Sequence, residues 1–377
     1  MRVLHLVKTA VGATWALRQM EALVGLDTDV HVAIPEGPLV DKYRSAGVTV
    51  HLLQTDFPFT RPWNFRPLAR RFRELVEQVH PAIIHSHFVG TTLTMRLSLG
   101  RRNSPPRIFQ VPGPLHLENA VFRNAELATA GACDYWIASC KWTRRRYHQS
   151  GVSPERTFLS YYGIDTSSFR RRSPGRLRQE LSLSKDTRIV GMVAYMYAPK
   201  RYLGQSKGLK GHEDFIDALA LVRRKRRDVV GVFIGGAWNG AHSYERRVRD
   251  YGKRRCGDGA IFLGTRSDVA ELYSDLDVVV HPSRSENLGG ALESLALGVP
   301  TIATNVGGFP DLVTDHETGW LVPPKSPTHI TGAIMDAFSD PKRAAAMAKR
   351  GNERVRALCD LSKTAREVRQ TYELLTA

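Results

Sequence analysis

The architecture of this chain follows most directly from the stretch His281-Pro-Ser-Arg-Ser-Glu286-Asn-Leu-Gly289-Gly290-Ala-Leu-Glu293-Ser-Leu-Ala-Leu-Gly298-Val-Pro300. A short buried strand is predicted at its start, from Val278 to His281, and a helix from Leu288 to Leu297. A second strand, Thr301 to Ala303, follows and leads into the turn Gly307-Gly308. This order predicts an open parallel sheet, in which ligands bind at the carboxyl ends of the strands.

The same stretch combines groups that suit a phosphate with groups that suit hydroxyls. Gly289 and Gly290 let the backbone approach a ligand, and the N-terminus of the following helix favours phosphate. Glu286 and Glu293 bracket that terminus and would repel a pyrophosphate, so hydroxyl groups are their expected partners. Together these groups predict a sugar nucleotide as the ligand. The alternative is a strand–helix unit whose glycines serve turns alone.

This pattern resembles the retaining glycosyltransferases of family 4, which have the GT-B fold. Their signature is Pro-Ser, a Glu, seven residues, a second Glu, then Ala/Ser-x-Ala-x-Gly-x-Pro and a Gly-Gly turn. Here only six residues separate Glu286 from Glu293. We interpret this as a one-residue contraction, as in a subgroup with a similar Ser-Glu-Asn-x-Gly-Gly-x-x-Glu arrangement. The resemblance covers nearly the whole chain and is most specific from Lys210 to Phe309.

Strand-like apolar runs alternate with helical patterns along the whole chain, which predicts parallel sheets covered on both faces. The runs in the first half are Val3 to Val7, Val30 to Ile34, Val48 to Leu53, Ala82 to His85, Ile108 to Val111 and Tyr135 to Ser139. Those in the second half are Ile189 to Ala194, Val230 to Gly235, Ile261 to Gly264, Val278 to His281, Thr301 to Ala303 and Gly319 to Val322.

The predicted fold class is therefore α/β, with two Rossmann-like, doubly wound parallel-sheet domains that face each other across a cleft, as in GT-B. We predict an N-terminal domain at 1–170, a linker at 171–185 and a C-terminal domain at 186–360. A last helix at 361–377 could pack back on the N-terminal domain.

The chain is strongly basic, with 54 Lys and Arg against 37 Asp and Glu and a net charge of +17. Its basic runs are scattered and are not interleaved with stacking aromatics, so nucleic acid is not a predicted partner. Arg223 to Arg227 closes a predicted helix, where cations complement the helix dipole. The alternative is a basic patch in peripheral contact with a membrane, which would suit an acceptor carried on lipid.

The location of the protein and the redox state of its cysteines are predicted from motifs that the sequence lacks. No run approaches the roughly 18 apolar residues that span a bilayer, and the N-terminus has no small-residue cleavage site. The four cysteines show no zinc-like spacing. We expect a cytoplasmic protein with free thiols.

The resemblance implies roles for cations outside the central stretch. Family members have Gly-Arg at the end of the first strand of the second domain and Lys-Gly five residues later, and both cations hold the donor pyrophosphate. Lys210-Gly211 matches the second element. The arginine is displaced by what resembles an insertion, and Arg201 is its best substitute. Two cations there would stabilise the departing nucleoside diphosphate.

The resemblance also assigns the donor to the C-terminal domain and the acceptor to the N-terminal one. Glu293 is expected to bind the ribose hydroxyls. The remaining donor-binding residues are expected to be Glu286, Asn287, Leu288, Gly289 and Gly290 for sugar and phosphate, with Thr265 and Arg266 near the base.

Three features of the first half bear on the acceptor side. Gly12 follows the first strand, where a G-x-G-x-x-G fingerprint is absent; this argues against NAD or FAD and leaves a phosphate or acceptor loop, or a plain turn. In the family a His at the end of the fifth strand contacts the transferred sugar. Pro112 occupies that place, and His116 either reaches the same space or packs at the next helix. His85 and His87 share one strand face, for which we predict a structural or acceptor-side role, with a metal site as the alternative.

Asp275-Leu-Asp277 resembles the metal-binding D-x-D motif of the other large glycosyltransferase fold. It precedes the strand Val278 to Val280, at the end away from the predicted ligand edge. We therefore interpret it as a helix-end and strand-start pair, and predict neither a metal nor a cofactor besides the donor substrate.

The resemblance implies a retaining glycosyltransferase that moves a hexose or N-acetylhexosamine from a nucleoside-diphosphate sugar, with UDP favoured, to a hydroxyl acceptor. The acceptor would be a small molecule or a lipid-linked sugar, in bacterial polysaccharide or antibiotic (aminocyclitol) biosynthesis. The alternatives are a sugar-nucleotide epimerase or phosphorylase of the same fold, and a non-catalytic nucleotide-binding module.

Overall fold

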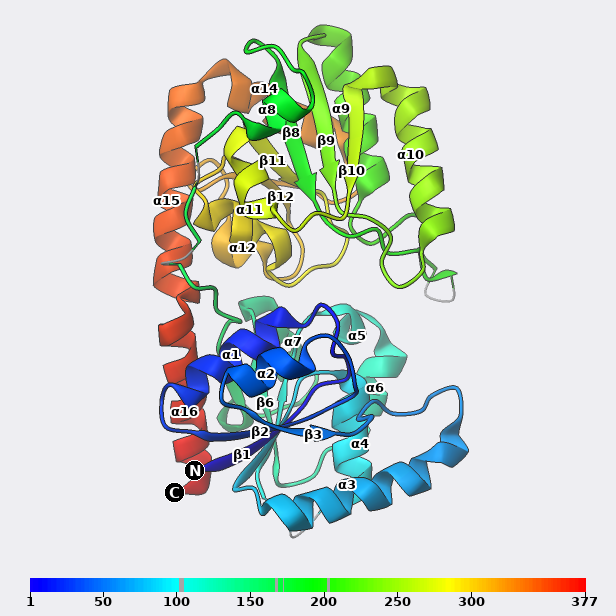
Figure 1. Ribbon diagram of the computed structural model, residues 1–377, viewed down its shortest axis with the longest axis vertical. Helices are drawn as coiled ribbons and strands as arrows, with labels where there is room; N and C mark the ends of the chain where they lie inside the picture. Colours follow the sequence, from blue (N-terminus) through cyan, green and yellow to red (C-terminus); the bar gives the residue numbers. More distant parts are fainter. Residues whose placement is uncertain (102–104, 167–168, 172, 202–203) are drawn as a thin grey trace. The chain divides into compact units, whose positions relative to one another are not determined.

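The computed structural model describes residues 1–101, 105–166, 169–171, 173–201 and 204–377. The chain forms two compact units (Figure 1). The first unit consists of Met1–Asp165 and Leu358–Ala377, and the second of Thr166–Ala357. The N-terminal segment of the first unit thus ends at Asp165, whereas the predicted domain extended to residue 170. In these described ranges no helix combines the length and apolar composition needed to cross a bilayer.

The described part of the first unit contains one fully parallel sheet with the strand order β3-β2-β1-β4-β5-β6-β7. Its strands are β1 (Arg2–Leu6), β2 (Asp29–Ile34), β3 (Thr49–Leu52), β4 (Ile83–Ser86), β5 (Arg107–Gln110), β6 (Asp134–Ala138) and β7 (Thr157–Leu159). All six predicted strands of the first half are confirmed. The edge strand β7 was not predicted, because three residues are too short to show a periodic pattern.

Helices cover both faces of this sheet. Met20 of α1 and Tyr372 of α16 share a buried cluster with Val3, whereas Phe72 of α3 and Met95 of α4 pack with Leu4. Neighbouring residues of β1 therefore point to opposite helical layers, as a doubly wound sheet requires. The helices are α1 (Thr14–Val24), α2 (Val40–Ser45), α3 (Phe65–Val79), α4 (Val89–Leu99), α5 (Leu115–Glu118), α6 (Ala120–Ala128), α7 (Lys141–Gln149) and α16 (Leu361–Thr376).

The second unit contains, among its described residues, a fully parallel sheet with the order β10-β9-β8-β11-β12-β13. Its strands are β8 (Arg188–Val193), β9 (Val229–Ile234), β10 (Ala260–Gly264), β11 (Val278–His281), β12 (Thr301–Thr304) and β13 (Trp320–Val322). All six predicted strands of the second half are confirmed, and so is the predicted helix after His281.

The helices of the second unit also form two layers. Phe215 of α9 packs with Val190, whereas Leu177 of α8 packs with Ile189 on the other face. Because α8 is part of this core, the prediction of a separate linker at 171–185 was wrong. The helices are α8 (Arg176–Glu180), α9 (His212–Lys225), α10 (His242–Cys256), α11 (Val269–Leu272), α12 (Gly289–Ala296), α13 (Phe309–Leu312), α14 (Pro327–Ser339) and α15 (Pro341–Cys359).

Three histidines are stacked in the core of the first unit. His5 of β1 is the register partner of His85 on β4, and His87 follows on the same face. The ring centroids of His5 and His85 are 4.8 Å apart, and those of His85 and His87 are 4.4 Å apart. His5 Nδ1 is 2.9 Å from His87 Nε2, while Tyr162 and Tyr372 contact His87 Nδ1 at 3.0 Å and His85 Nδ1 at 2.5 Å. The cluster thereby joins α16 to the sheet.

Three imidazoles whose nitrogen atoms lie within 4.8 Å of one another are also enough ligands for a metal. His5 was not predicted to join the other two rings, because it lies on a neighbouring strand far away in the sequence. Hydrogen bonds engage both nitrogens of His87, whereas His85 Nε2 is buried without a hydrogen-bond partner among the described residues. The absence of a metal stays a prediction. Burial lowers the pKa of His5 to about 3 and holds the pKa values of His85 and His87 well below their ordinary value.

These depressed pKa values predict that acid destabilises the protein. Between about pH 6.5, where unfolded histidine titrates, and about pH 3, the unfolded chain binds more protons than the folded chain. The contribution of these rings to the free energy of unfolding is therefore fully present above pH 6.5. It is lost as the pH falls, by up to about 1.4 kcal/mol per pH unit for each ring. Urea unfolding at pH 7.0, 6.0 and 5.0 measures this slope.

A matched pair of variants assigns the slope to the cluster. His87→Gln should reduce the slope, because it removes one buried ring. His148→Gln, which removes an exposed histidine of the same unit, should leave it as in the wild type. Equal slopes in all three proteins would contradict the assignment.

Candidate functional site

The predicted donor residues of the central stretch meet at the carboxyl edge of the second unit's sheet. β8 and β11 are neighbours in this sheet, with Val190 paired to Val278. Lys210 lies between β8 and α9, and Glu286 lies between β11 and α12. Lys210 Nζ donates to Glu286 Oε2 and forms an ion pair with it, and both side chains are largely buried.

Neighbouring groups fix the charge and position of this pair. Glu286 Oε1 accepts from the Asn287 N–H at 3.1 Å, and Ser283 Oγ donates to Oε2 at 3.4 Å. Burial acts to lower the pKa of Lys210, but the charge and hydrogen bond of Glu286, together with the charge of Glu293, outweigh it and raise that pKa. Lys210 is therefore a buried, permanently charged ammonium at neutral pH.

Glycines allow the loop between β8 and α9 to approach the loop between β11 and α12 closely. Gly211, directly after Lys210, has φ +75°, and a Cβ there would lie 2.0 Å from the carbonyl oxygen of Pro282. At Gly289, with φ +35°, a Cβ would lie 2.8 Å from the Glu286 carboxyl carbon. At Gly290 it would lie 2.6 Å from His281 Cε1. Side chains at these positions would push Lys210, Glu286 and α12 apart.

Helix α12 presents its N-terminus to the same place. Gly289 and Gly290 open the helix, so its first N–H groups have no acceptors within it. Leu288 precedes them and is buried, anchoring the turn. Asn287 is also buried, and its Oδ1 has no hydrogen-bond partner among the described residues. The edge thus offers backbone donors, an ammonium, a carboxylate and an unsatisfied amide oxygen.

Glu293 lies one turn into α12 and is half-buried. Its charge acts on Lys210, and it adds to burial in raising the pKa of Tyr273. Lys210, Glu286, Asn287 and Glu293 are thereby gathered around one helix terminus. Such a group can bind an anion and several hydroxyls together.

The other predicted residues do not join this group. Arg201 is exposed, and no contact of its side chain with Lys210 or Glu286 occurs among the described residues. Thr265 is exposed after β10. Arg266 donates to Glu180 at 2.6 and 3.0 Å and to Asp268 at 2.7 and 2.8 Å, so its guanidinium already serves two carboxylates.

Gly12 and His116 belong to the first unit. Gly12 lies in the exposed loop between β1 and α1 with φ +72°. His116 is 9% exposed, its Nε2 is 3.1 Å from the Tyr147 hydroxyl, and its ring packs against Phe109. Burial lowers the pKa of His116 to about 4. This placement favours packing in the core over contact with a sugar.

Aromatic side chains beside Lys210 were not identified from the sequence. Lys210 Nζ lies 5.7 Å from the centroid of the Tyr197 ring, and the Trp238 ring lies 5.7 Å from Tyr197 and 5.0 Å from Tyr195. A bridge between Met196 and Ala237 continues the β8–β9 pairing and aligns these residues. The sequence signal that could have identified them is an aromatic residue shortly after each of two predicted strands, Tyr195 after Ala194 and Trp238 three residues after Gly235. Their faces can stack on a sugar or a base.

Two family models match the chain in consecutive segments. Residues 12–168 match the model of glycosyltransferase family 4, and residues 201–354 match the model described as glycosyl transferases group 1. The family 4 segment contains Gly12 and His116, and the group 1 segment contains Lys210, Glu286 and Glu293.

Curated relatives match over part of their length. The lipopolysaccharide core biosynthesis mannosyltransferase LpsB of Rhizobium meliloti is 28% identical over 220 residues, which are 57% of this chain and 60% of the relative. The D-inositol 3-phosphate glycosyltransferase of Segniliparus rotundus is 29% identical over 203 residues, which are 53% of this chain and 43% of the relative. The chain therefore spans less than two thirds of these relatives.

Solved structures match the whole chain. HepE of Anabaena, crystallised with UDP-glucose, has a TM-score of 0.82 at 19% identity and covers 99% of this chain and 100% of its own. The sucrose-phosphate synthase of Thermosynechococcus elongatus has a TM-score of 0.80 at 22% identity and covers 100% of this chain and 99% of its own. At such identities the likeness shows the fold. The likeness therefore shows the GT-B fold, and each of the two family models matches less than half of the chain.

Proposed function

We propose that the protein is a retaining glycosyltransferase that moves a hexose or N-acetylhexosamine from a nucleoside-diphosphate sugar, with UDP favoured, to a hydroxyl acceptor. The observation that carries the proposal is the buried Lys210–Glu286 pair beside the N-terminus of α12. An ammonium and free helix N–H groups suit a diphosphate, and the carboxylates suit sugar and ribose hydroxyls. The name of LpsB and the UDP-glucose in HepE support this class of substrate.

The chemistry follows from where charge develops. The bond between the anomeric carbon and the diphosphate oxygen breaks, and the acceptor oxygen forms a new bond to that carbon. Negative charge builds on the diphosphate, and the ammonium of Lys210 would stabilise it there. Glu286 holds the ammonium in place and would accept a hydrogen bond from the transferred sugar. Glu293 would accept hydrogen bonds from the ribose.

Retention is proposed from the resemblance to family 4. The acceptor would attack on the face that the diphosphate leaves, and the departing phosphate would take the acceptor proton. Positioning and electrostatics would then supply most of the catalysis, and no carboxylate needs to act as a nucleophile. Arg201, Thr265 and Gly12 stay predicted contributors to the donor and acceptor sites. Bacterial polysaccharide or aminocyclitol biosynthesis is the proposed setting.

A nucleotide panel tests the substrate class first. UDP, GDP, ADP, dTDP and NAD are each added near-millimolar while thermal unfolding is followed. A ligand at 100 times its Kd stabilises the folded chain by about 2.7 kcal/mol, so one diphosphate, expected to be UDP, should raise the midpoint selectively. The matching sugar nucleotides are then screened with acceptors, and NMR of the product reports the anomeric configuration. No shift with any nucleotide would contradict the proposal.

Lys210→Met should lower kcat by roughly 10²–10³-fold, the loss typical for one charge-stabilising donor. Lys207→Met is the control, because Lys207 belongs to the same loop and pairs with Asp214 and Asp217. Steady-state kinetics with the sugar nucleotide found above measure both variants. Near-normal turnover in Lys210→Met would remove Lys210 from the site.

Glu293→Gln should weaken UDP binding by about tenfold, because a hydrogen bond to a charged group is worth about 1.5–3 kcal/mol and 1.4 kcal/mol is a factor of ten. Calorimetric titration measures the Kd. Glu317→Gln, which changes an exposed glutamate of the same unit, should bind as the wild type does. An unchanged Kd in Glu293→Gln would exclude its proposed role at the ribose.

A further inference from the structure

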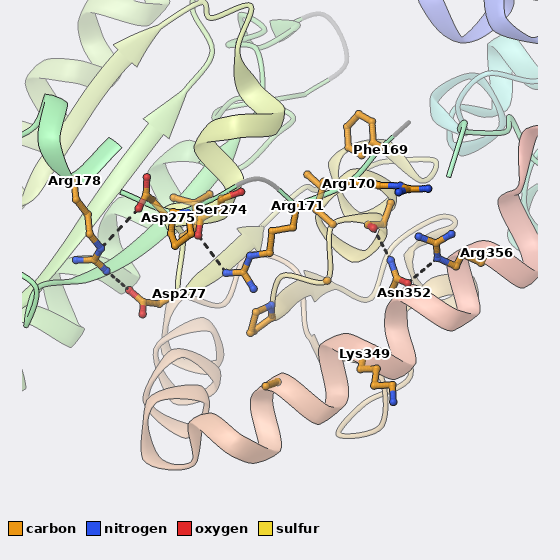
Figure 2. Close-up of a pocket in the computed structure, with 17 residues that line it drawn as sticks. Phe169, Arg170, Arg171, Arg178, Ser274, Asp275, Asp277, Lys349, Asn352 and Arg356 are labelled. Carbon is orange, nitrogen blue, oxygen red and sulfur yellow. Dashed lines mark hydrogen bonds and ion pairs between the residues drawn. The ribbon is translucent and has the colours of Figure 1, made fainter. Parts of the chain in front are cut away.

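A pocket of about 710 Å³ lies at the opposite, amino-terminal edge of the second unit's sheet (Figure 2). Asp277 and Pro300 line it, and each immediately precedes a strand, β11 and β12 respectively. Lys210 and Glu286 follow the other ends of β8 and β11. The pocket is therefore separate from the proposed donor site, and a ligand bound there would be independent of the proposed function.

Each of the two carboxylates of this pocket faces a guanidinium group, because Arg178 lies 3.9 Å from Asp275 and also pairs with Asp277. Asp275 accepts from the N–H groups of Gly175 at 2.6 Å and Leu177 at 2.8 Å, at the start of α8. Asp277 pairs with Arg178 at 3.3 Å and with Arg188 at 3.0 Å. This agrees with the interpretation of Asp275-Leu-Asp277 as a structural pair. Neither carboxylate is left to oppose an anion.

The remaining charged residues that line the pocket in the described ranges are all cations: Arg170, Arg171, Lys349 and Arg356. Arg171 donates to the Ser274 carbonyl oxygen at 3.3 Å, and Arg356 donates to Asn352 Oδ1 at 2.9 Å. Both acceptors are neutral, so these bonds position the guanidinium groups without cancelling their charge. Lys349 and Arg356 lie seven residues apart on α15, about two turns, and so share one face of the helix.

Asn352 removes a feature that would repel an anion. The C-terminal end of α12 reaches the pocket, and the last carbonyl groups of a helix carry partial negative charge. Asn352 Nδ2 donates to the carbonyl oxygen of Leu295 at 3.2 Å and to that of Ala296 at 2.5 Å. One side chain therefore caps α12 and holds Arg356 at the wall (Figure 2).

We propose that this pocket binds an organic phosphate. Arg171, Lys349 and Arg356 would hold the phosphate, because guanidinium and ammonium groups are the usual partners of that anion. The volume exceeds what a bare phosphate fills, and Phe169, Leu276 and Leu297 add apolar surface for a carbon skeleton. A phosphate attached to a carbon skeleton occurs both in a soluble sugar phosphate and in the headgroup of an anionic phospholipid.

Calorimetric titration with glucose 6-phosphate at low salt tests whether the pocket binds a soluble sugar phosphate. The pocket variant is Arg171→Gln/Lys349→Gln/Arg356→Gln. The control is Arg246→Gln/Arg247→Gln/Lys253→Gln, which removes the same charge from exposed positions of α10. The pocket variant should bind at least about tenfold more weakly, and the control within about twofold of wild type, because only the former removes the phosphate partners. Lys349→Glu alone, at an exposed position, should also weaken binding and guards against misfolding of the triple variant.

Sedimentation with vesicles tests the lipid source. Wild type and control should sediment with phosphatidylglycerol vesicles more than with phosphatidylcholine vesicles, and the pocket variant should not, if the ligand is a lipid headgroup. A pocket-dependent signal with either probe supports the proposal and names its source. The proposal is overturned if neither probe binds, if binding survives in the pocket variant, or if the control loses it equally. It is also overturned if Lys210→Met abolishes binding, because the phosphate would then sit at the donor site.

Discussion

Parallel pairing of the strands is the constraint on which the rest of the structure depends. Every pair in both sheets is parallel, so the loops after the strands of one sheet emerge at one edge and those before them at the other. In the second unit, the strand order turns back between β8 and β11. Lys210 and Glu286 follow these two strands and meet there, although 76 residues separate them. Such switch points are where α/β sheets bind ligands.

The two edges of the second sheet use similar charges in different ways. At the carboxyl edge a buried cation and carboxylate touch, and the charge of Glu286 overcomes the burial that would lower the pKa of Lys210. At the amino edge the carboxylates Asp275 and Asp277 serve the start of α8 and two arginines. Other cations of that edge, Lys349 and Arg356 among them, line a pocket. The two edges of one sheet therefore differ in how their charged side chains are paired.

The first unit shows how the same constraint builds a core. Because β1 and β4 pair in register, His5 stacks on His85, and the tyrosine of α16 reaches the rings. The C-terminal helix is thus joined to the first unit by polar contacts as well as by Val368. Burial lowers the pKa values of these rings, which predicts that the unit loses stability as the pH falls.

Twelve of the strands, the two doubly wound sheets and the grouping of Glu286, Asn287 and Glu293 at α12 could be predicted from the sequence, because periodic burial and glycine spacing are local patterns. The sequence could place Glu286, Gly289 and Glu293 together, since they share one turn of chain and helix. The tertiary structure alone shows that His5 completes the histidine cluster, that Tyr197 lies beside Lys210 with Trp238 against Tyr197, and that Glu180 engages Arg266. It also decided that α8 belongs to a core, and that His116 is held by Tyr147. Each of these depends on which strands are neighbours and in what register, and that choice is made by contacts between residues far apart in the chain.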